Sequence, residues 1–320
     1  MSAAHKPGRR AVAAGAAALM LSTVLPGLAP AQARDDLPPP EGGIGGTGIV
    51  GLLTSVQPLS INGLELTEAS DTLFRDAFGQ ISPASLRPGQ SVTILARAVG
   101  DAAPRAVLVD RMTPLIGTLE RTGTGLAVNG VALRTEQGVQ PGAAIGSRVA
   151  VSGLWDGNSV VASRIDPAPE GAPDVIAGTL ERSLTGNRIA GVPVTRGSGA
   201  LRIPDHGFGT FLGQYGDGRF TVSQVSAGRF QGQGARSLRA LLVEGYLEPA
   251  DRSPGYRVSG LGHSFDRAAR LAPVAGERVL FEGPYRDTFR VETGLVLPEE
   301  AGARRRLLAR DGGGRRVGLR

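Results

Sequence analysis

Residues 117–134, with the sequence GTLERTGTGLAVNGVALR, show the unit from which the chain is built. Gly-Thr-Leu-Glu-Arg at residues 117–121 recurs at residues 178–182, and each copy is followed by a two-residue loop that ends in glycine between apolar residues. After residues 117–121 that loop is Asn129-Gly130, the strongest short-range hairpin signal, because both central residues of a type I′ turn require positive φ. The pattern predicts a β-strand that leads into a tight β-hairpin.

The same pattern occurs four times along the chain, with further copies that begin at Gly51 and Gly245. The loop glycines are Gly63, Gly130, Gly191 and Gly260. Their spacing of 61 to 69 residues is that of a small domain and not of a solenoid repeat. Asn62-Gly63 is again a strong hairpin signal, whereas Ala190-Gly191 and Ser259-Gly260 are weaker forms of it. We therefore expect four consecutive small β-domains.

The second unit, residues 113–168, has the clearest strand pattern. Strands are expected at residues 115–121, 125–128, 131–135, 148–154 and 159–165. Val149 and Val151 alternate with Ala150 and Ser152, which is the period of a strand with one face on a core. Five short strands in each unit predict an all-β fold of tandem OB-like barrels, each a five-stranded, partly open Greek-key barrel. An SH3-like barrel has a similar strand spacing and stays an alternative.

The rest of the chain divides around these units. The predicted boundaries are a signal peptide at 1–33, a flexible Pro/Gly leader at 34–47, barrels at 48–112, 113–168, 169–240 and 241–298, and an Arg-rich tail at 299–320. The third repeat contains a Gly-rich insertion at 197–234, in which only residues 219–225 are predicted to form a strand. In the fourth repeat, residues 265–271 are a candidate short helix. The Pro-rich linker at 167–173 predicts a division into two pairs of repeats, one on each side of it.

The recurring pattern resembles a known family. Each unit combines Gly-x-(Leu/Val)-x, an apolar-Asn-Gly-apolar hairpin, Gly-(Ser/Gln/Glu)-x-Val-x-(Val/Ile/Phe) and a closing strand like Ala162-Ser163-Arg164-Ile165. This pattern is similar to domain-of-unknown-function family 5666, whose domains occur in tandem in exported proteobacterial proteins. The resemblance covers most of residues 48–298 and is weakest across 197–234. It implies an exported protein with OB-like domains and supplies no catalytic residues.

The first 33 residues have the composition of a cleavable signal peptide. Three basic residues precede an apolar run from Ala11 to Leu28, and small residues lead to a cleavage site between Ala33 and Arg34. This predicts a periplasmic or secreted protein, exported by the general or the twin-arginine route. Retention of the segment as a membrane anchor stays an alternative. No second apolar run approaches the roughly 20 residues that a membrane-spanning helix needs.

Composition excludes several classes of site. The chain has no cysteine, which rules out disulfides, thiolate metal sites and cysteine nucleophiles. Its formal charge is +6, but the signal segment and the tail carry the excess, and residues 34–300 hold 25 basic and 28 acidic residues. A slightly acidic body weighs against nucleic-acid binding, which usually requires a basic surface. Nucleic-acid binding through the OB-type barrels is therefore a weaker alternative.

Candidate catalytic residues are few. After residue 33 the only histidines are His206 and His263. A catalytic triad needs a nucleophile, a base and an orienting group, and the chain has no Gly-x-Ser-x-Gly elbow. Both histidines are therefore expected in surface loops, and no cofactor or metal is predicted. A hydrolase that uses Asp205 and His206 in the 197–234 insertion stays an alternative.

Two aromatic residues and the tail are candidate binding elements. Trp155, the only tryptophan, is next to a predicted hairpin tip, and Tyr285 has the comparable position in the fourth repeat. Loops of OB-type barrels bind oligosaccharides and oligonucleotides, so either ring is a candidate ligand-binding residue, with packing at the barrel end as the alternative. Arg304, Arg305 and Arg306 are in a tail that we expect to be solvated, where they would contact anionic lipid, lipopolysaccharide or an acidic protein.

The sequence thus predicts an exported, non-enzymatic protein of tandem β-barrels. Its expected partner is a polysaccharide or a protein of the cell envelope, with the arginine tail as an additional electrostatic contact.

Overall fold

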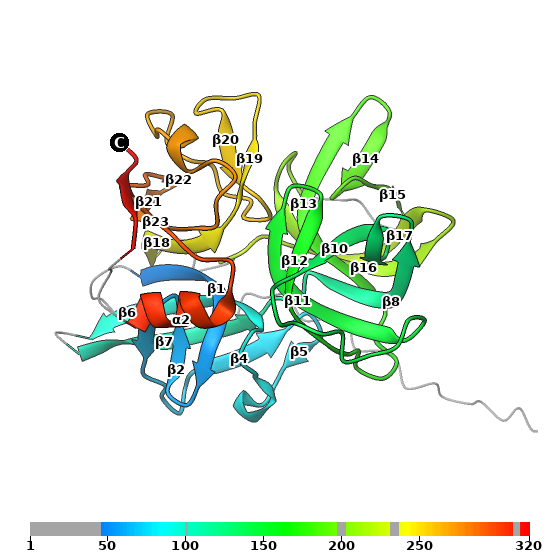
Figure 1. Cartoon of the computed structure of the whole chain (residues 1–320), viewed down its shortest axis with the longest axis horizontal. Coiled ribbons are helices and arrows are strands. Elements are labelled where there is room, and N and C mark those ends of the chain that lie inside the picture. The colour runs from blue at the N-terminus through cyan, green and yellow to red at the C-terminus, as the bar shows by residue number, and fades with distance from the viewer. Residues whose placement is uncertain (1–45, 100–101, 197–202, 231–236, 310–313) are drawn as a thin grey trace, which may run out of the picture. The chain divides into compact units, whose positions relative to one another are not determined.

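In the part of the chain that the structure describes, nearly all regular structure is β-strand, as a computed structural model shows (Figure 1). The structure describes residues 46–99, 102–196, 203–230, 237–309 and 314–320. The predictions for the signal peptide, including the cleavage site at Ala33 and Arg34, and for the leader up to residue 45 lie outside the described residues. Within these ranges, no helix combines the length and the apolar character that crossing a bilayer requires.

The second repeat forms a closed five-stranded ring, which we name barrel 2. Its strands are β8 (Leu115–Thr122), β9 (Gly125–Val128), β10 (Val131–Thr135), β11 (Arg148–Asp156) and β12 (Ser159–Pro167). β8, β9 and β10 form an antiparallel meander, β10 pairs with β12 in parallel, and β11 joins β12 back to β8. A parallel pair between the third and fifth strands is the ring order of an OB-type barrel, which confirms the predicted fold class.

Barrel 3 has the same ring order in the repeat that looked least regular. It consists of β13 (Asp174–Ser183), β14 (Gly186–Ile189), β15 (Val192–Arg196), β16 (Phe208–Gly216) and β17 (Arg219–Ala227). β16 lies inside the predicted insertion, so the prediction of a single strand there was wrong. Its glycines are required by close backbone approach, because a Cβ on Gly213 would lie 2.0 Å from the Thr221 carbonyl oxygen. These glycines interrupt the alternation of apolar and polar residues from which a strand is predicted.

Barrel 1 is the same ring with an additional hairpin. It contains β1 (Gly46–Val56), β2 (Leu59–Ile61), β3 (Leu64–Leu66), β6 (Ser91–Val99) and β7 (Ala102–Arg111). The parallel contact that closes the ring is a single bridge between Thr67 and Arg105. Between the third and fourth strands of the ring lie β4 (Leu73–Asp76), β5 (Gly79–Gln80) and a short 3-10 helix, η1 (Pro83–Ser85), and β4 pairs with β7.

Barrel 4 is the most reduced of the four. It contains β18 (Leu238–Gly245), β19 (Leu247–Pro249), β20 (Tyr256–Val258), β21 (Val279–Arg286), β22 (Thr288–Phe289) and β23 (Thr293–Val296). Its third strand is only a parallel bridge between Phe265 and Phe289, whose rings stack at 5.4 Å. Residues 265–271 are therefore not a helix, because Phe265 belongs to the barrel wall. A 3-10 helix, η2 (Ala272–Val274), follows it.

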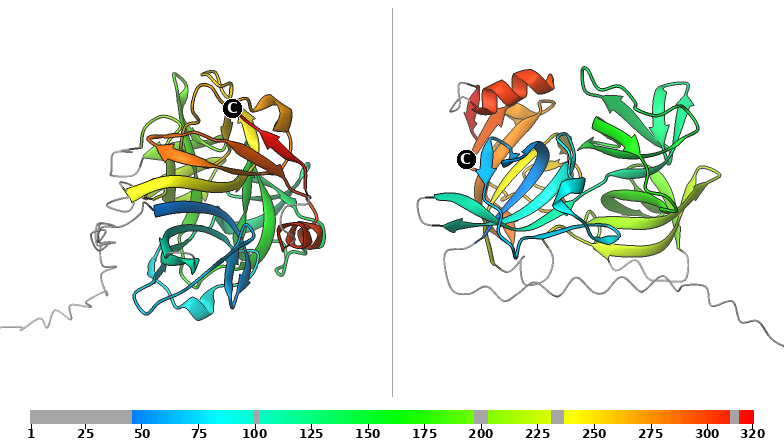
Figure 2. Two further views of the ribbon diagram at one scale, coloured as in Figure 1. Left: turned by 90° about the vertical axis from the view of Figure 1, so that its left-hand side faces the viewer. Right: turned by 90° about the horizontal axis from the view of Figure 1, so that it is seen from below.

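The barrels associate in pairs through their first strands. β1 pairs in parallel with β18, which joins barrels 1 and 4, and β8 pairs antiparallel with β13, which joins barrels 2 and 3. Figure 2 shows β1 in blue, β18 in yellow and β21 in orange side by side in its left view. The expected division at the 167–173 linker was therefore wrong, since this linker connects two barrels of one sheet.

In barrels 1 and 2, a contact between a glycine and an asparagine explains the shared sequence pattern. Asn62 and Asn129 occupy the hairpin turns with φ of 54° and 52°, and their Nδ2 atoms donate to the carbonyls of Val50 and Ile116 at 2.9 and 2.8 Å. A Cβ on Gly117 would lie 2.1 Å from Asn129 Oδ1, and Gly51 faces Asn62 in the same way. The turn side chain thus reaches the first strand only because that strand has glycine.

The C-terminal segment is part of the folded structure. Helix α2 (Ala301–Ala309) lies beside barrel 1, and Leu307 and Leu308 pack against the core of that barrel. β24 (Arg316–Gly318) pairs with β23. A helix within residues 299–310 is confirmed, but the expectation of a solvated tail was wrong for these elements, because apolar residues between the arginines give the segment a face to bury.

Candidate functional site

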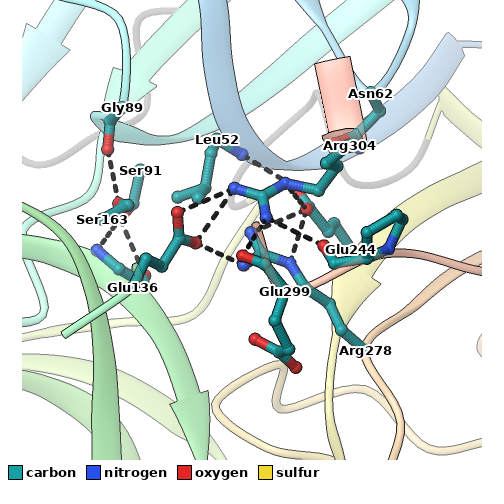
Figure 3. Close-up of polar contacts among 12 residues, drawn as sticks. Leu52, Asn62, Gly89, Ser91, Glu136, Ser163, Glu244, Arg278, Glu299 and Arg304 are labelled. Atoms are coloured by element: carbon teal, nitrogen blue, oxygen red, sulfur yellow. Dashed lines mark hydrogen bonds and ion pairs between the residues drawn. The ribbon is translucent and has the colours of Figure 1, made fainter. Parts of the chain in front are cut away.

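Four charged side chains from different parts of the chain meet at a point that we call the junction cluster (Figure 3). Glu136 follows β10 of barrel 2, Glu244 is on β18, Arg278 precedes β21, and Arg304 extends from α2. The members are separated by up to 168 residues in the sequence, as the Glu136–Arg304 pair shows. The cluster therefore ties barrel 2 to barrel 4 and to the C-terminal helix.

Each charge in the junction cluster has an opposite charge within hydrogen-bonding distance. Arg278 Nε donates to Glu244 Oε1 at 2.9 Å, and Arg278 also pairs with Glu136. Arg304 Nη2 lies 3.0 and 2.8 Å from the two carboxylate oxygens of Glu136. The backbone N–H of Leu52, on β1, donates to Glu244 Oε2 at 3.2 Å and brings barrel 1 into the network.

The junction cluster is almost fully removed from water. The exposed fraction of the side chains is 0% for Arg278, 2% for Glu136, 3% for Glu244 and 8% for Arg304. Burial by itself lowers the pKa of Arg278, but the charges of Glu244 and Glu136 outweigh it and raise that pKa above its ordinary value. Two cations and two anions balance, which is the condition under which such burial is tolerable.

A cavity of about 180 Å³ adjoins the junction cluster, and its lining includes Glu136, Glu244, Arg304, Asn62 and Ser163. Most polar groups at its wall have partners, but Asn62 Oδ1 is buried without a hydrogen-bond partner among the described residues. Ser163 Oγ donates to the carbonyl of Gly89 at 2.6 Å, and Asn62 is bonded to the first strand. Because Ser163 of barrel 2 donates to the Gly89 carbonyl of barrel 1, this wall, like the junction cluster, is suited to holding barrels together.

A second cavity, which we call the boundary pocket, lies where barrel 1 passes into barrel 2. Its volume is about 80 Å³. Its lining includes the polar and aromatic residues Asp76, Phe78, Gln90, Arg111, Ser152 and Asp166. Phe78 is 43% exposed, in the turn between β4 and β5. In contrast to the junction cluster, this pocket presents a large apolar ring to solvent.

Local hydrogen bonds fix the wall of the boundary pocket. The Phe78 backbone N–H donates to Asp76 Oδ1 at 2.8 Å, and Asp76 Oδ2 accepts from Arg111 Nη2 at 2.5 Å. Gln90 Oε1 accepts from the backbone N–H of Arg87 at 3.0 Å, which orients the amide. The turn that carries the ring and the amide beside it are therefore both held in place by the protein.

Trp155 is not available to a ligand. It is 4% exposed, and its Nε1 donates to the carbonyl of Ala177 at 2.8 Å. The hairpin tip beside it is covered by barrel 4, since Gly157 N donates to Ser259 Oγ at 3.0 Å. A Cβ on Gly260 would lie 2.2 Å from the indole. The ligand-binding prediction for Trp155 was wrong, because the predicted end of barrel 2 is an interface between barrels.

Tyr285 lies half-buried beside a histidine. Its hydroxyl is 2.9 Å from His263 Nδ1, and the two rings meet edge to face with centroids 5.2 Å apart. Burial raises the pKa of Tyr285, and Asp287 adds to the effect. Burial, together with the nearby charge of Arg229, lowers the pKa of His263 to about 4. A ligand-binding role for Tyr285 stays a prediction.

Asp205 and His206 have structural partners. Asp205 Oδ1 accepts from the backbone N–H groups of Arg182 and His206 at 2.9 and 3.1 Å. His206 Nδ1 is 2.6 Å from Arg257 Nη1, and its Nε2 is 3.5 Å from Asp205 Oδ2. Both ring nitrogens face charged groups, and the carboxylate stabilises the loop. This arrangement does not resemble a base poised beside a nucleophile.

Arg304, Arg305 and Arg306 are consecutive in the sequence but differ in burial. Arg304 is buried in the junction cluster, so the prediction that it contacts an anionic surface was wrong, whereas Arg305 and Arg306 are exposed on α2. The signal that sequence reasoning missed is Glu244, a charge at the end of the apolar run Leu241-Leu242-Val243. A buried carboxylate there requires a cationic partner.

No family model, no curated protein and no solved structure matches this chain. The resemblance to domain family 5666 stays a prediction.

Proposed function

We propose that the protein is an exported, non-enzymatic binding protein whose OB-type barrels hold a polysaccharide of the cell envelope. Signal-like composition supports export, and barrels of this type are used elsewhere to bind oligosaccharides. The pairing of first strands and the junction cluster give the barrels fixed contacts with one another. A fixed surface loses little conformational entropy on binding, which favours recognition by a preformed site.

The observation that carries this proposal is the boundary pocket. It combines an exposed aromatic ring with polar groups that the fold holds in place, the usual composition of a small-ligand site. It also lies between two barrels, where ligand sites commonly occur. In the junction cluster, by contrast, the charges are paired with one another, which supports a holding role.

Retention of the purified protein on isolated envelope material tests the proposal. The material is divided into untreated, protease-digested and periodate-oxidised portions, because periodate cleaves the vicinal diols of sugars and leaves most protein structure intact. We expect retention on the untreated and protease-digested portions and loss of retention after periodate. If retention is lost on the protease-digested portion and kept on the periodate-oxidised portion, the result would favour a protein partner. No retention on any portion would contradict the proposed function.

The contribution of the exposed arginines is tested with Arg305→Ala/Arg306→Ala. A truncation at Pro298 is unsuitable, because it would also remove Arg304 from the junction cluster. If the arginines add an electrostatic contact to an anionic surface, the double substitution weakens retention at low salt and has little effect at high salt. Equal retention of the two proteins at low salt would exclude that contact.

A further inference from the structure

We infer that the boundary pocket is a subsite for one neutral sugar residue of a longer chain, with Phe78 as its stacking platform; this rests on the proposed function. The first support is the ring itself. Phe78 is 43% exposed although it is a large apolar side chain, and its turn is held by the bond from its N–H to Asp76. One face of a pyranose ring carries C–H groups, which pack well on the electron-rich face of an aromatic ring.

The second support is a set of polar groups with spare bonding capacity. Among the described residues, Gln90 Nε2, Ser152 Oγ and Asp166 Oδ1 have no hydrogen-bond partner, and all three residues line the pocket, although Gln90 and Ser152 are only 6% and 5% exposed. The amide nitrogen of Gln90 is a donor, the hydroxyl of Ser152 both donates and accepts, and the carboxylate oxygen of Asp166 is an acceptor. Sugar hydroxyls both donate and accept, so adjacent hydroxyls of one residue match this mixture.

The third support is the charge of the pocket. Asp76 is paired with Arg111, and Asp166 Oδ2 accepts from Arg164 Nε at 2.6 Å. Each carboxylate thus already has a cation beside it, and the pocket has no unbalanced charge to attract an ion. A charged ligand would lose its hydration and gain no countercharge in return. A neutral sugar needs no countercharge, because its hydroxyl groups exchange hydrogen bonds with water for hydrogen bonds with the pocket.

The size of the pocket sets how much of the ligand it takes. Its volume of about 80 Å³ is well below the ~300–1,000 Å³ of sites that enclose a whole drug-sized molecule. It therefore accommodates the hydroxyl-bearing edge of one residue, whose ring lies over Phe78, while the remainder of the chain extends into solvent. Such a contact is weak on its own.

Affinity electrophoresis of the full chain tests the subsite. Native gels contain one of four neutral soluble polysaccharides, namely glucan, mannan, xylan or galactomannan, and retardation is measured against a gel without polymer. Phe78→Ala removes the platform, and Phe78→Trp keeps and enlarges it. Leu184→Ala is the matched control, since Leu184 is a fully exposed apolar residue at the β13–β14 turn of barrel 3.

We expect at least one polysaccharide to retard the natural protein, Leu184→Ala and Phe78→Trp. Phe78→Ala should weaken the apparent affinity about 2- to 12-fold, the range that corresponds to an aromatic contact of ~0.5–1.5 kcal/mol. Equal retardation of Phe78→Ala and the natural protein would overturn the subsite and leave the proposed function standing. The subsite is also overturned if none of the four polymers retards the natural protein, and the envelope-retention experiment then decides the proposed function separately.

Discussion

The junction cluster and the boundary pocket are both built from polar side chains at contacts between barrels, yet their hydrogen bonding differs. In the junction cluster each carboxylate is bonded to guanidinium groups, and the most exposed side chain is 8% exposed. In the boundary pocket, Gln90, Ser152 and Asp166 keep unused bonding atoms next to a ring that is 43% exposed. The first arrangement stabilises the fold, and the second leaves bonding capacity for a ligand.

This difference follows from the cost of burial. A buried ion that loses its partner retains its desolvation penalty, so a buried cluster is stable only when it is complete. A neutral group that reaches a cavity bonds to water there until a ligand replaces that water, so leaving it without a protein partner costs less than leaving a buried ion unpaired, even where little of the side chain is exposed, as at Gln90 and Ser152. Substitutions should therefore affect stability in proportion to burial, and they should affect binding only at the pocket.

The largest effect is expected for Arg278→Met. The substitution leaves Glu136 and Glu244 with one cation between them, and we expect the free energy of unfolding to fall by about 3–5 kcal/mol. Urea denaturation followed by circular dichroism measures it. Adding Glu244→Gln removes the excess negative charge and should restore part of the loss. A decrease below about 1 kcal/mol for Arg278→Met would show that the cluster does not stabilise the fold.

A smaller effect is expected for Asn129→Ala, because this side chain is neutral. Its Nδ2 donates to Ile116 O in its own barrel at 2.8 Å and to Val175 O of barrel 3 at 3.1 Å. Removing it leaves two buried carbonyls without this donor, which should cost about 1–3 kcal/mol in the free energy of unfolding. Ala190, at the equivalent turn of barrel 3, is the natural control: Ala190→Ser should change stability much less. A similar loss at both turns would contradict the role assigned to Asn129.

Acidification should destabilise the protein through His263. Its pKa is lowered to about 4 in the folded protein, from an ordinary value of 6.5, by burial and by Arg229. The unfolded chain therefore takes up a proton first, so this contribution is complete above pH 6.5 and is lost as the pH falls from 6.5 toward 4. Because the ring is half-buried, the loss should be about 1–2 kcal/mol.

The contribution of His263 is isolated by comparing its pH profile of stability with that of His263→Gln. The groups that face the imidazole are the Tyr285 hydroxyl, the Phe230 ring and the Arg229 charge, none of which titrates between pH 4 and 6.5. The difference between the two profiles should change across that interval. Parallel profiles would show that His263 is not held in its neutral form.

The smallest effect on stability is expected for Phe78→Ala. An exposed side chain outside the core should change the free energy of unfolding by no more than about 0.5 kcal/mol. Urea denaturation of Phe78→Ala and Leu184→Ala should give the same midpoint within error. A marked destabilisation by Phe78→Ala alone would assign the ring a structural role and remove the contrast with the junction cluster.

The strands of barrel 2 could be predicted from sequence almost residue by residue. Alternation of apolar and polar residues and the Asn129-Gly130 turn are local signals, and the strand at 131–135 has the predicted bounds. β16 was missed because Gly209 and Gly213 are imposed by contacts with other segments, which a local pattern does not contain. The same limit applies to Phe78 and Asp166, which share a pocket although they are far apart in the sequence.

By itself, the sequence determined that the protein consists of repeated five-stranded β-units, because turn chemistry and strand periodicity act between near neighbours in the chain. Only the tertiary structure decided that barrel 1 pairs with barrel 4, that Trp155 is enclosed, and that Arg304 is a buried ion while Arg305 and Arg306 are exposed. These outcomes depend on which segments distant in sequence exclude water from one another. The free energy of burying a charged or aromatic side chain depends on this exclusion of water and not on the residue's neighbours in the sequence.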